Sequence, residues 1–165
     1  MPDPITAWRI TQARYADDRA AGGGAFSGEG ARRYGGRWNS RGTAVAYTAG
    51  SRSLALLEIL VHAESTRLLG HYVLIPVTFD VRFVETLSED RLPEGWQAHP
   101  APSSTQEIGD AWARGERSAI LRVPSVILPA EPNFLLNPAH PDFAELTIGQ
   151  PERLDVDRRF LDAAG

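Results

Sequence analysis

The sequence predicts a single α+β domain of 165 residues. A chain of this length can bury a sizeable core, and no internal repeat or second domain is visible in it. Segments with strand-like and helix-like patterns do not alternate regularly, which favours an α+β arrangement over a parallel α/β one. With 42% hydrophobic and 23% charged residues, the composition is that of an ordinary globular protein.

The predicted strands are short. Residues 71–81 show the best strand alternation, and Pro76 within them indicates a sheet edge or a bulge. A strand over residues 43–48 would place Val45 and Tyr47 on one face. The remaining predicted strands cover residues 5–11, 118–128 (interrupted at Pro124) and 132–138.

Two helices are predicted with more definite boundaries. Ser51 is a suitable N-cap for a helix over residues 52–64, and most of that helix's circumference is apolar, so we expect it to be buried. A second helix is predicted over residues 105–115, although Gly109 weakens it. From Pro151 onward we expect a final strand or helix and a frayed end.

The glycine-rich stretch Ala20–Gly36 is predicted to be a mobile loop, and residues 89–104 a surface loop. The glycines do not fit a dinucleotide-binding G-x-G-x-x-G motif, because Ser27 stands where the count from Gly22 requires glycine. The P-loop pattern is excluded as well, since the sequence contains no lysine.

The composition excludes several kinds of chemistry. All 17 basic residues are arginine, which removes Schiff-base catalysis by lysine. Cysteine is absent, so disulfides, thiolate catalysis and cysteine-ligated zinc are excluded. The histidines lack metal-ligand spacing, and we expect no metal site. They are His62, His71, His99 and His140.

Charge is distributed unevenly along the chain. Residues 1–52 hold eight arginines and four acidic residues, a balance of +4, whereas the remainder holds nine and seventeen, a balance of −8. The electropositive first third could attract phosphates, but the acidic remainder argues against a general nucleic-acid binder. The N-terminus lacks a signal-peptide pattern, and the apolar runs are too short to span a bilayer. We therefore expect a cytoplasmic protein without membrane association.

The segment from Gly35 to Glu58 contains the strongest candidate site. Glu58 lies in an otherwise apolar helix, where an unpaired carboxylate would be costly. Arg37 follows two glycines, which allow close approach to a ligand, and its guanidinium suits phosphate oxygens. Tyr47 could stack on a flat ring. Each residue alone also has a structural explanation: an ion-paired or solvated glutamate, a solvated arginine and a core tyrosine.

Three other polar residues need an explanation. Ser125 follows a proline in an apolar run, so its hydroxyl needs a backbone or ligand partner, and the absence of G-x-S-x-G argues against a nucleophile. Asn137 precedes a proline and is most simply a turn residue. His62 lies one helical turn from Glu58 and could shift the pKa of that carboxylate, or be merely structural.

Taken together, these residues resemble the RES domain, a family named for its arginine, glutamate and serine. The spacing of Arg37, Tyr47 and Glu58, 10 and then 11 residues, is similar to that of the family. The motifs that carry the resemblance are WR at Trp8–Arg9, GGRWNSRG, AVAYT, SLALLE, VPS and LLNP.

The resemblance implies one RES domain over residues 1–165, with a fold like that of the ADP-ribosyltransferases: a split β-sheet core with flanking helices. It also implies an enzyme, the toxin of a bacterial type II toxin–antitoxin system. This enzyme would degrade NAD⁺ by cleaving the nicotinamide–ribose bond, through hydrolysis or phosphorolysis. NAD⁺ would then be the substrate rather than a cofactor, and inorganic phosphate could be a co-substrate.

The family's functional positions carry over residue by residue. Those implied in catalysis are Glu58, Arg37 and Tyr47, and those implied in NAD⁺ binding are Arg9, Arg37, Tyr47, Ser125 and Asn137. In the resulting hypothesis Glu58 stabilises positive charge on the ribose in an oxocarbenium-like state. Arg37, with Arg9, binds the pyrophosphate. Tyr47 stacks on nicotinamide, and Ser125 forms a hydrogen bond near the ribose or the nicotinamide.

The implied partner is an Xre-type helix-turn-helix antitoxin, which would form a hetero-oligomer that blocks the active site and would alone contact DNA. Two alternatives remain open. The same residues could serve a protein ADP-ribosyltransferase, in which a protein side chain replaces water or phosphate as acceptor. A non-catalytic nucleic-acid-binding module would instead use the arginines, show steeply salt-dependent binding and have no use for Glu58. Its arginines would be Arg32, Arg33, Arg37 and Arg41.

Overall fold

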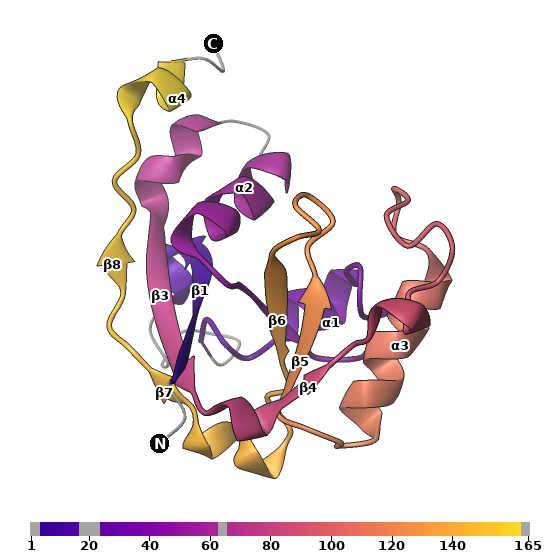
Figure 1. Ribbon diagram of the computed structural model, residues 1–165. Coiled ribbons are helices and arrows are strands. Elements are labelled where there is room, and N and C mark those ends of the chain that lie inside the picture. The colour runs from indigo at the N-terminus through magenta and orange to yellow at the C-terminus, as the bar shows by residue number, and fades with distance from the viewer. Residues whose placement is uncertain (1–3, 17–23, 63–65, 163–165) are drawn as a thin grey trace.

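The computed structural model describes residues 4–16, 24–62 and 66–162, and shows a curled sheet with helices packed against it (Figure 1). Its strands are β1 (Ile5–Gln12), β2 (Ala46–Ala49), β3 (Tyr72–Phe79), β4 (Val84–Thr86), β5 (Ile120–Pro124), β6 (Pro132–Leu136), β7 (Thr147–Ile148) and β8 (Glu152–Arg153). Its α-helices are α1 (Glu29–Tyr34), α2 (Arg52–His62), α3 (Ser103–Arg114) and α4 (Arg158–Asp162). Short 3₁₀ helices cover Ala13–Tyr15, Thr66–His71, Val81–Phe83, Glu89–Arg91 and Pro141–Glu145.

The strands form one mixed sheet in the order β4-β5-β6-β2-β1-β3-β7, and β8 also pairs with β3. Strands β4 and β5 run parallel, and the other pairs are antiparallel. This mixture, with helices between some strands and not others, is the predicted α+β class.

The sheet is nearly divided between β1 and β2. Their register contains one aligned pair, Trp8 opposite Ala49, whereas β1 and β3 are aligned over the whole range from Ile5 to Gln12. Strand β2 is aligned with β6 over all of its residues. The two parts of the sheet therefore diverge beyond Trp8, as expected for a split β-sheet core.

Helices α2 and α3 cover the same face of the sheet at two ends. Ala49 and Tyr47 are two residues apart on β2, so their side chains point to the same side. Ala49 belongs to the apolar cluster that contains Leu54 of α2. Tyr47 packs against the cluster that contains Trp112 of α3. Tyr47 therefore lies on the face that both helices cover, on the side of α3.

The opposite face carries the largest apolar cluster. Phe79 and Phe134 meet there in an edge-to-face arrangement with ring centroids 5.4 Å apart. The buried members of this cluster are Ala7, Ala25, Phe26, Ala46, Ile75, Val77, Phe79, Ala119, Ile120, Phe134, Leu136 and Leu146. With this cluster on one face and the helices on the other, apolar side chains of both faces are buried.

The expectation that the helix over residues 52–64 would be buried was wrong for its outer side. Leu54 and Ala55 are buried, but Val61 is 64% exposed. Only the side of α2 that faces the strands packs, because one sheet can cover only one face of a helix. Residues 63–65 lie outside the described residues.

The prediction of a loop over Ala20–Gly36 was wrong in its second half, where α1 forms. Glu29 N–H donates to Ser27 Oγ at 3.2 Å, and Glu29 pairs with Arg32 and Arg33 at helical spacing. Asn39 also donates to the carbonyl of Ala31. These ion pairs and this hydrogen bond offset the low helix propensity of the three glycines in and beside this short helix. The part of the predicted loop at residues 17–23 lies outside the described residues.

The remaining boundaries differ from the predictions by a few residues. Strand β2 starts at Ala46 rather than residue 43, and α3 starts at Ser103 within the predicted surface loop. The predicted apolar strand 118–128 is shorter, since β5 ends at Pro124 and a turn follows. The segment from Pro151 contains both a strand, β8, and a helix, α4.

Pro76 lies at a gap in the outer pairing of β3, in agreement with the predicted edge. Strand β7 pairs at Val77 and Thr78, and β8 pairs at Val73 and Leu74. The proline lacks an N–H, and its carbonyl accepts a hydrogen bond from Gly149. Among the helices described, none combines the length and apolar character needed to cross a membrane.

Candidate active site

Glu58 of α2 and Ser125 at the end of β5 are joined by a hydrogen bond. Ser125 Oγ donates to Glu58 Oε1 at 2.8 Å. Glu58 lies one helical turn after the fully buried Leu54, so it projects toward the packed side of α2 rather than into solvent. The structural explanation of Glu58 as a freely solvated surface residue therefore does not hold. Figure 1 shows how close α2 comes to the turn between β5 and β6.

The Ser125 hydroxyl has a full set of hydrogen bonds. Besides its bond to Glu58, its oxygen accepts from the N–H groups of Ile127 and Leu128 at 3.1 and 3.2 Å. A hydroxyl offers one proton and two lone pairs, so these three bonds use them all. Ser125 is 0% exposed. The serine thus orients a carboxylate and closes a turn, and its proton is directed at Glu58.

Arg37 lies on the same side of the sheet and is held at its guanidinium group. Its Nη1 donates to the carbonyls of Trp96 and Ala98 at 2.8 and 2.9 Å. Burial lowers the pKa of Arg37 from its ordinary value, and the nearby Tyr47 and Glu58 act in the opposite direction. Arg37 is therefore close enough to both groups to interact with them electrostatically.

The Tyr47 hydroxyl fixes the backbone that follows Gly36. It accepts a hydrogen bond from Trp38 N–H at 3.0 Å and donates one to Asn39 Oδ1 at 2.6 Å. Burial raises its pKa well above the ordinary value. A Cβ added to Gly36 would lie 2.6 Å from this hydroxyl, so only glycine fits there. Tyr47 thus has a structural role at its hydroxyl, and stacking on its ring stays a prediction.

Arg9 reaches the point where β1 and β2 diverge. Its Nη1 donates to the carbonyl of Tyr47 at 3.1 Å, and its Nε is buried without a partner among the described residues. Burial lowers the pKa of Arg9 to about 10. The structure therefore brings Arg9 next to Tyr47 through the backbone of β2, and an unsatisfied donor remains on its guanidinium.

Asn137 lies at the other end of β6 from Ser125. Pro124, just before Ser125, is aligned with Pro132 at the start of β6, whereas Asn137 follows the last residue of that strand. Asn137 Nδ2 donates to Ala113 O at 3.0 Å, and its Oδ1 accepts from Ala139 N–H at 3.1 Å. Its buried amide closes a turn below α3, so the structure does not bring it together with Glu58.

His62 is exposed at the last residue of α2. Across the described part of the chain, no three His, Asp or Glu side chains are grouped as a metal ion would require. The hydrogen bond that Glu58 receives there comes from Ser125 rather than from His62. The alternative in which His62 is a structural residue agrees with this placement.

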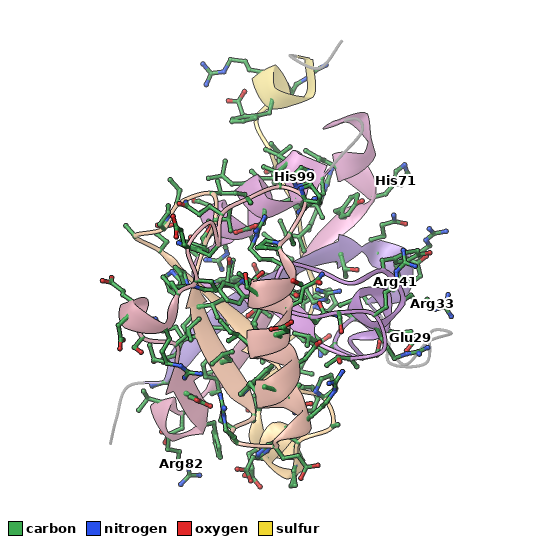
Figure 2. All side chains as sticks on the ribbon, turned by 90° about the vertical axis from the view of Figure 1, so that its right-hand side faces the viewer. Glu29, Arg33, Arg41, His71, Arg82 and His99 are labelled. Carbon is green, nitrogen blue, oxygen red and sulfur yellow. The ribbon has the colours of Figure 1, made fainter. Side chains whose placement is uncertain are left out.

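The arginines proposed for a nucleic-acid-binding module do not present four free charges. Arg32 and Arg33 are paired with Glu29, and Arg37 is half-buried against main-chain carbonyls. Figure 2 shows Glu29 projecting on the same side as Arg33 and Arg41, which places an acidic group within this basic surface. The arrangement disfavours a phosphate-tracking surface.

Sequence reasoning missed the groups that hold Arg37. Trp96 and Ala98 act through their carbonyls, which no side-chain type reveals, and they lie in a segment predicted only as a surface loop. Asn39 was also missed: it is 0% exposed and donates to three carbonyls. A signal for Asn39 exists in the sequence, since an asparagine between glycine-rich turns often bonds to the backbone.

A family model of the RES domain matches residues 6–157. The chain belongs to the RES domain family. This RES domain is 45% identical over 160 residues to the "Prs ADP-ribosylating toxin" of Sphingobium sp. (strain YBL2), covering 93% of this chain and 95% of that protein. It is 39% identical to a "Toxin Res" of Yersinia enterocolitica, covering 93% and 97%.

The fold of this RES domain is also found in a solved structure. The crystal structure of the M. tuberculosis MbcT–MbcA toxin–antitoxin complex contains a chain that superposes with a TM-score of 0.70. The match covers 99% of this chain and 90% of that chain, at 21% sequence identity. At this identity the likeness concerns the fold, which is α+β in both.

Proposed function

We propose that this RES domain is the toxin of a toxin–antitoxin system and that it acts by consuming NAD⁺. Two similar proteins carry toxin names, and one of them is called an ADP-ribosylating toxin, a name that requires an ADP-ribose donor. The observation that carries the proposal is the Glu58–Ser125 hydrogen bond. It holds a carboxylate on the face that also carries Arg37 and Tyr47.

Cleavage of the nicotinamide–ribose bond separates neutral nicotinamide from an oxocarbenium-like ribose. The electron pair of the broken C–N bond leaves with nicotinamide, so no proton needs to be donated to the leaving group. Positive charge develops on the ribose, and the Glu58 carboxylate stabilises it electrostatically. Ser125 keeps that carboxylate in one orientation through its only proton.

The two arginines would bind the pyrophosphate of the substrate. Arg37 uses Nη1 for the carbonyls of Trp96 and Ala98, so the rest of its guanidinium would contact phosphate oxygens. The Nε of Arg9, which is buried and has no partner among residues 4–16, 24–62 and 66–162, is a donor of the kind an anionic ligand satisfies. Tyr47 would offer its ring to nicotinamide, since its hydroxyl is engaged elsewhere.

Water, phosphate or a protein side chain could accept the ADP-ribose. Water gives ADP-ribose and a proton, and inorganic phosphate gives ADP-ribose-1″-phosphate. A second candidate function is ADP-ribosylation of a protein, and the name of the 45% identical relative favours it. Both candidates use the same residues and differ only in the acceptor.

The proposed partner is an antitoxin that covers this face and keeps the enzyme inactive. The similar MbcT–MbcA structure is a complex of toxin and antitoxin, which supports a protein partner. We propose an Xre-type helix-turn-helix protein, so that DNA contact belongs to the antitoxin. An enzyme that consumes NAD⁺ would work in the cytoplasm, where that substrate is made.

The test is incubation of the purified chain with NAD⁺, with and without phosphate, followed by chromatography and mass spectrometry. Glu58→Ala is the inactive variant, and Glu145→Ala, which removes an exposed carboxylate from the Pro141–Glu145 turn, is the matched control. We expect wild type and Glu145→Ala to consume NAD⁺ and Glu58→Ala to lose at least about 10²-fold in rate.

The product distinguishes the candidates. ADP-ribose or its 1″-phosphate identifies a soluble acceptor, whereas NAD⁺ loss only on addition of cell extract, with a labelled protein, identifies a protein acceptor. If Glu58→Ala consumed NAD⁺ as fast as the wild type in every condition, the assignment of Glu58 would be wrong.

A further inference from the structure

We infer that helix α3 is the element that positions Arg37 and that Thr105 and Gln106 are positioning residues for substrate binding. This inference rests on the proposed function, since it concerns the same site. Neither residue was a candidate from the sequence, and within the described part of the chain neither forms a hydrogen bond with Glu58 or Ser125.

The first turns of α3 bind the backbone on both sides of the Arg37 side chain. Thr105 Oγ1 lies 2.6 Å from the carbonyl oxygen of Arg37 and 3.0 Å from that of Pro102, and its single proton is donated to the nearer acceptor, Arg37. Gln106 Nε2 donates to the carbonyl of Gly36 at 3.0 Å. Two consecutive carbonyls of the arginine's segment are therefore attached to two consecutive residues of one helix.

One turn further along α3, the same segment is attached again. Asp110 accepts hydrogen bonds from both the N–H and the hydroxyl of Ser40. Its carboxylate belongs to a residue that is 6% exposed. Burying a carboxylate is unfavourable unless it has partners. The partners of Asp110 are the two groups of Ser40 and, at a longer distance, Arg114.

Between these attachments, helix and loop are in direct backbone contact. A Cβ on Gly109 would lie 1.6 Å from the carbonyl oxygen of Trp38, so no side chain fits between them. Trp38 also packs in the cluster that contains Trp112 of the same helix. The segment from Gly36 to Ser40 is therefore packed directly against α3.

The guanidinium end of Arg37 is attached to the chain that leads into the same helix. Trp96 and Ala98, whose carbonyls accept from Nη1, precede α3 by a few residues. Figure 2, in which α3 faces the viewer, shows this helix in front of the strands. The backbone and the side chain of Arg37 are thus both held by residues 96–110.

This arrangement separates substrate binding from the chemical step. Glu58 and Ser125 belong to α2 and the β5–β6 turn, outside the segment that holds Arg37. An arginine that binds the pyrophosphate contributes equally to substrate and transition state, so loosening it raises KM and leaves kcat unchanged. A purely structural role for Thr105 would instead lower the amount of folded enzyme.

The test compares Thr105→Val, which keeps the shape and removes the hydroxyl, with Thr105→Ser, which keeps the hydroxyl. We expect Thr105→Val to raise the KM for NAD⁺ about 10-fold with kcat within about 2-fold, the effect of losing one hydrogen bond. Thr105→Ser should restore a KM close to that of the wild type. Circular dichroism and thermal unfolding monitor the fold.

Thr105 is fully buried, so a second pair of variants guards against misfolding. Gln106→Met removes the donor to Gly36 at a half-buried position, and Glu107→Gln alters its exposed neighbour. We expect a raised KM only for Gln106→Met. A wild-type KM in both Thr105→Val and Gln106→Met would overturn the inference, and so would a loss confined to kcat.

Binding of ADP-ribose, measured by calorimetry, provides a readout that does not depend on turnover. The same variants should weaken its binding by the same factor as they raise KM, because ADP-ribose contains the pyrophosphate. If the wild type bound ADP-ribose but left NAD⁺ intact, the proposed reaction would fail while the positioning of Arg37 could still be measured. If the wild type neither bound ADP-ribose nor consumed NAD⁺, both proposals would be rejected.

Discussion

Ser125 and Glu58 are 67 positions apart in the chain, and a hydrogen bond of 2.8 Å joins them. It connects the turn after β5 to the middle of α2, on the face of the sheet that also carries Tyr47. Glu58 supplies the carboxylate of the pair, and the hydroxyl of Ser125 fixes the orientation of that carboxylate. Because these two tasks are chemically distinct, substitutions can separate them.

Glu58→Gln should remove the charge while keeping the hydrogen bond, because the amide oxygen of glutamine can accept from Ser125. We expect the free energy of unfolding in urea to change by less than about 1 kcal/mol. The rate of NAD⁺ consumption should fall about 10²–10³-fold, as for loss of one electrostatic group in an active site. Rates near those of the wild type would show that the carboxylate charge has no part in the reaction.

Ser125→Ala should instead destabilise the fold. It leaves the N–H groups of Ile127 and Leu128 without their acceptor and Glu58 without its donor. We expect a loss of roughly 1–3 kcal/mol in urea unfolding, since buried polar groups lose their partners. Ser53→Ala, at an exposed position of α2, is the matched control and should be nearly neutral. An unchanged unfolding midpoint for Ser125→Ala would contradict this role.

Gly109→Ala should be among the most destabilising single-methyl additions in the protein. The new Cβ would overlap the carbonyl oxygen of Trp38, so the helix or the loop has to move. We expect a loss of at least about 1–3 kcal/mol, as for overpacking of a core. Gly30→Ala, within α1 and with open space around its Cβ, should be neutral or stabilising by up to about 1 kcal/mol. Equal effects of the two substitutions in thermal unfolding would refute this explanation.

Gly109 also shows what the sequence can and cannot predict about the fold. Glycine at this position predicted a weak helix, and the helix forms nevertheless. Glycine is required there because a Cβ would overlap the carbonyl oxygen of Trp38. The alternation of residues 71–81 predicted β3 well, since it reflects a local period. The exposed outer side of α2 could not be predicted, because burial depends on which elements pack against a helix.

The candidate site also contains some residues that the sequence predicts and others that it does not. Residue types and spacing indicated Glu58, Arg37 and Tyr47 as candidate site residues, because the chemistry of a carboxylate, a guanidinium and a phenol follows directly from the residue type. The carbonyls of Trp96 and Ala98 could not be predicted, since every residue has a carbonyl. For Asn137 the simpler interpretation as a turn residue agrees with the hydrogen bonds of its amide to Ala113 and Ala139.

The phenol of Tyr47 makes stability depend on pH in the alkaline range. Its folded-state pKa is raised above the ordinary value of about 10, mainly by burial. Above pH 10 the unfolded chain therefore loses a proton that the folded protein keeps, and stability falls as pH rises. Tyr47→Phe should lose less stability than the wild type between about pH 9 and pH 11 in urea unfolding. Parallel pH profiles would show that the buried phenol does not contribute.

Arg9 should make stability depend on pH in the direction opposite to that of Tyr47. Burial lowers its folded-state pKa to about 10, so below that pH the folded protein keeps an unfavourable buried cation, and stability from this group rises with pH above it. Arg9→Met removes the cation and one hydrogen bond to Tyr47. We expect an unfolding free energy at pH 8 equal to or above that of the wild type, with a raised KM for NAD⁺. A loss above about 2 kcal/mol would mean that the hydrogen bond outweighs the cost of burial.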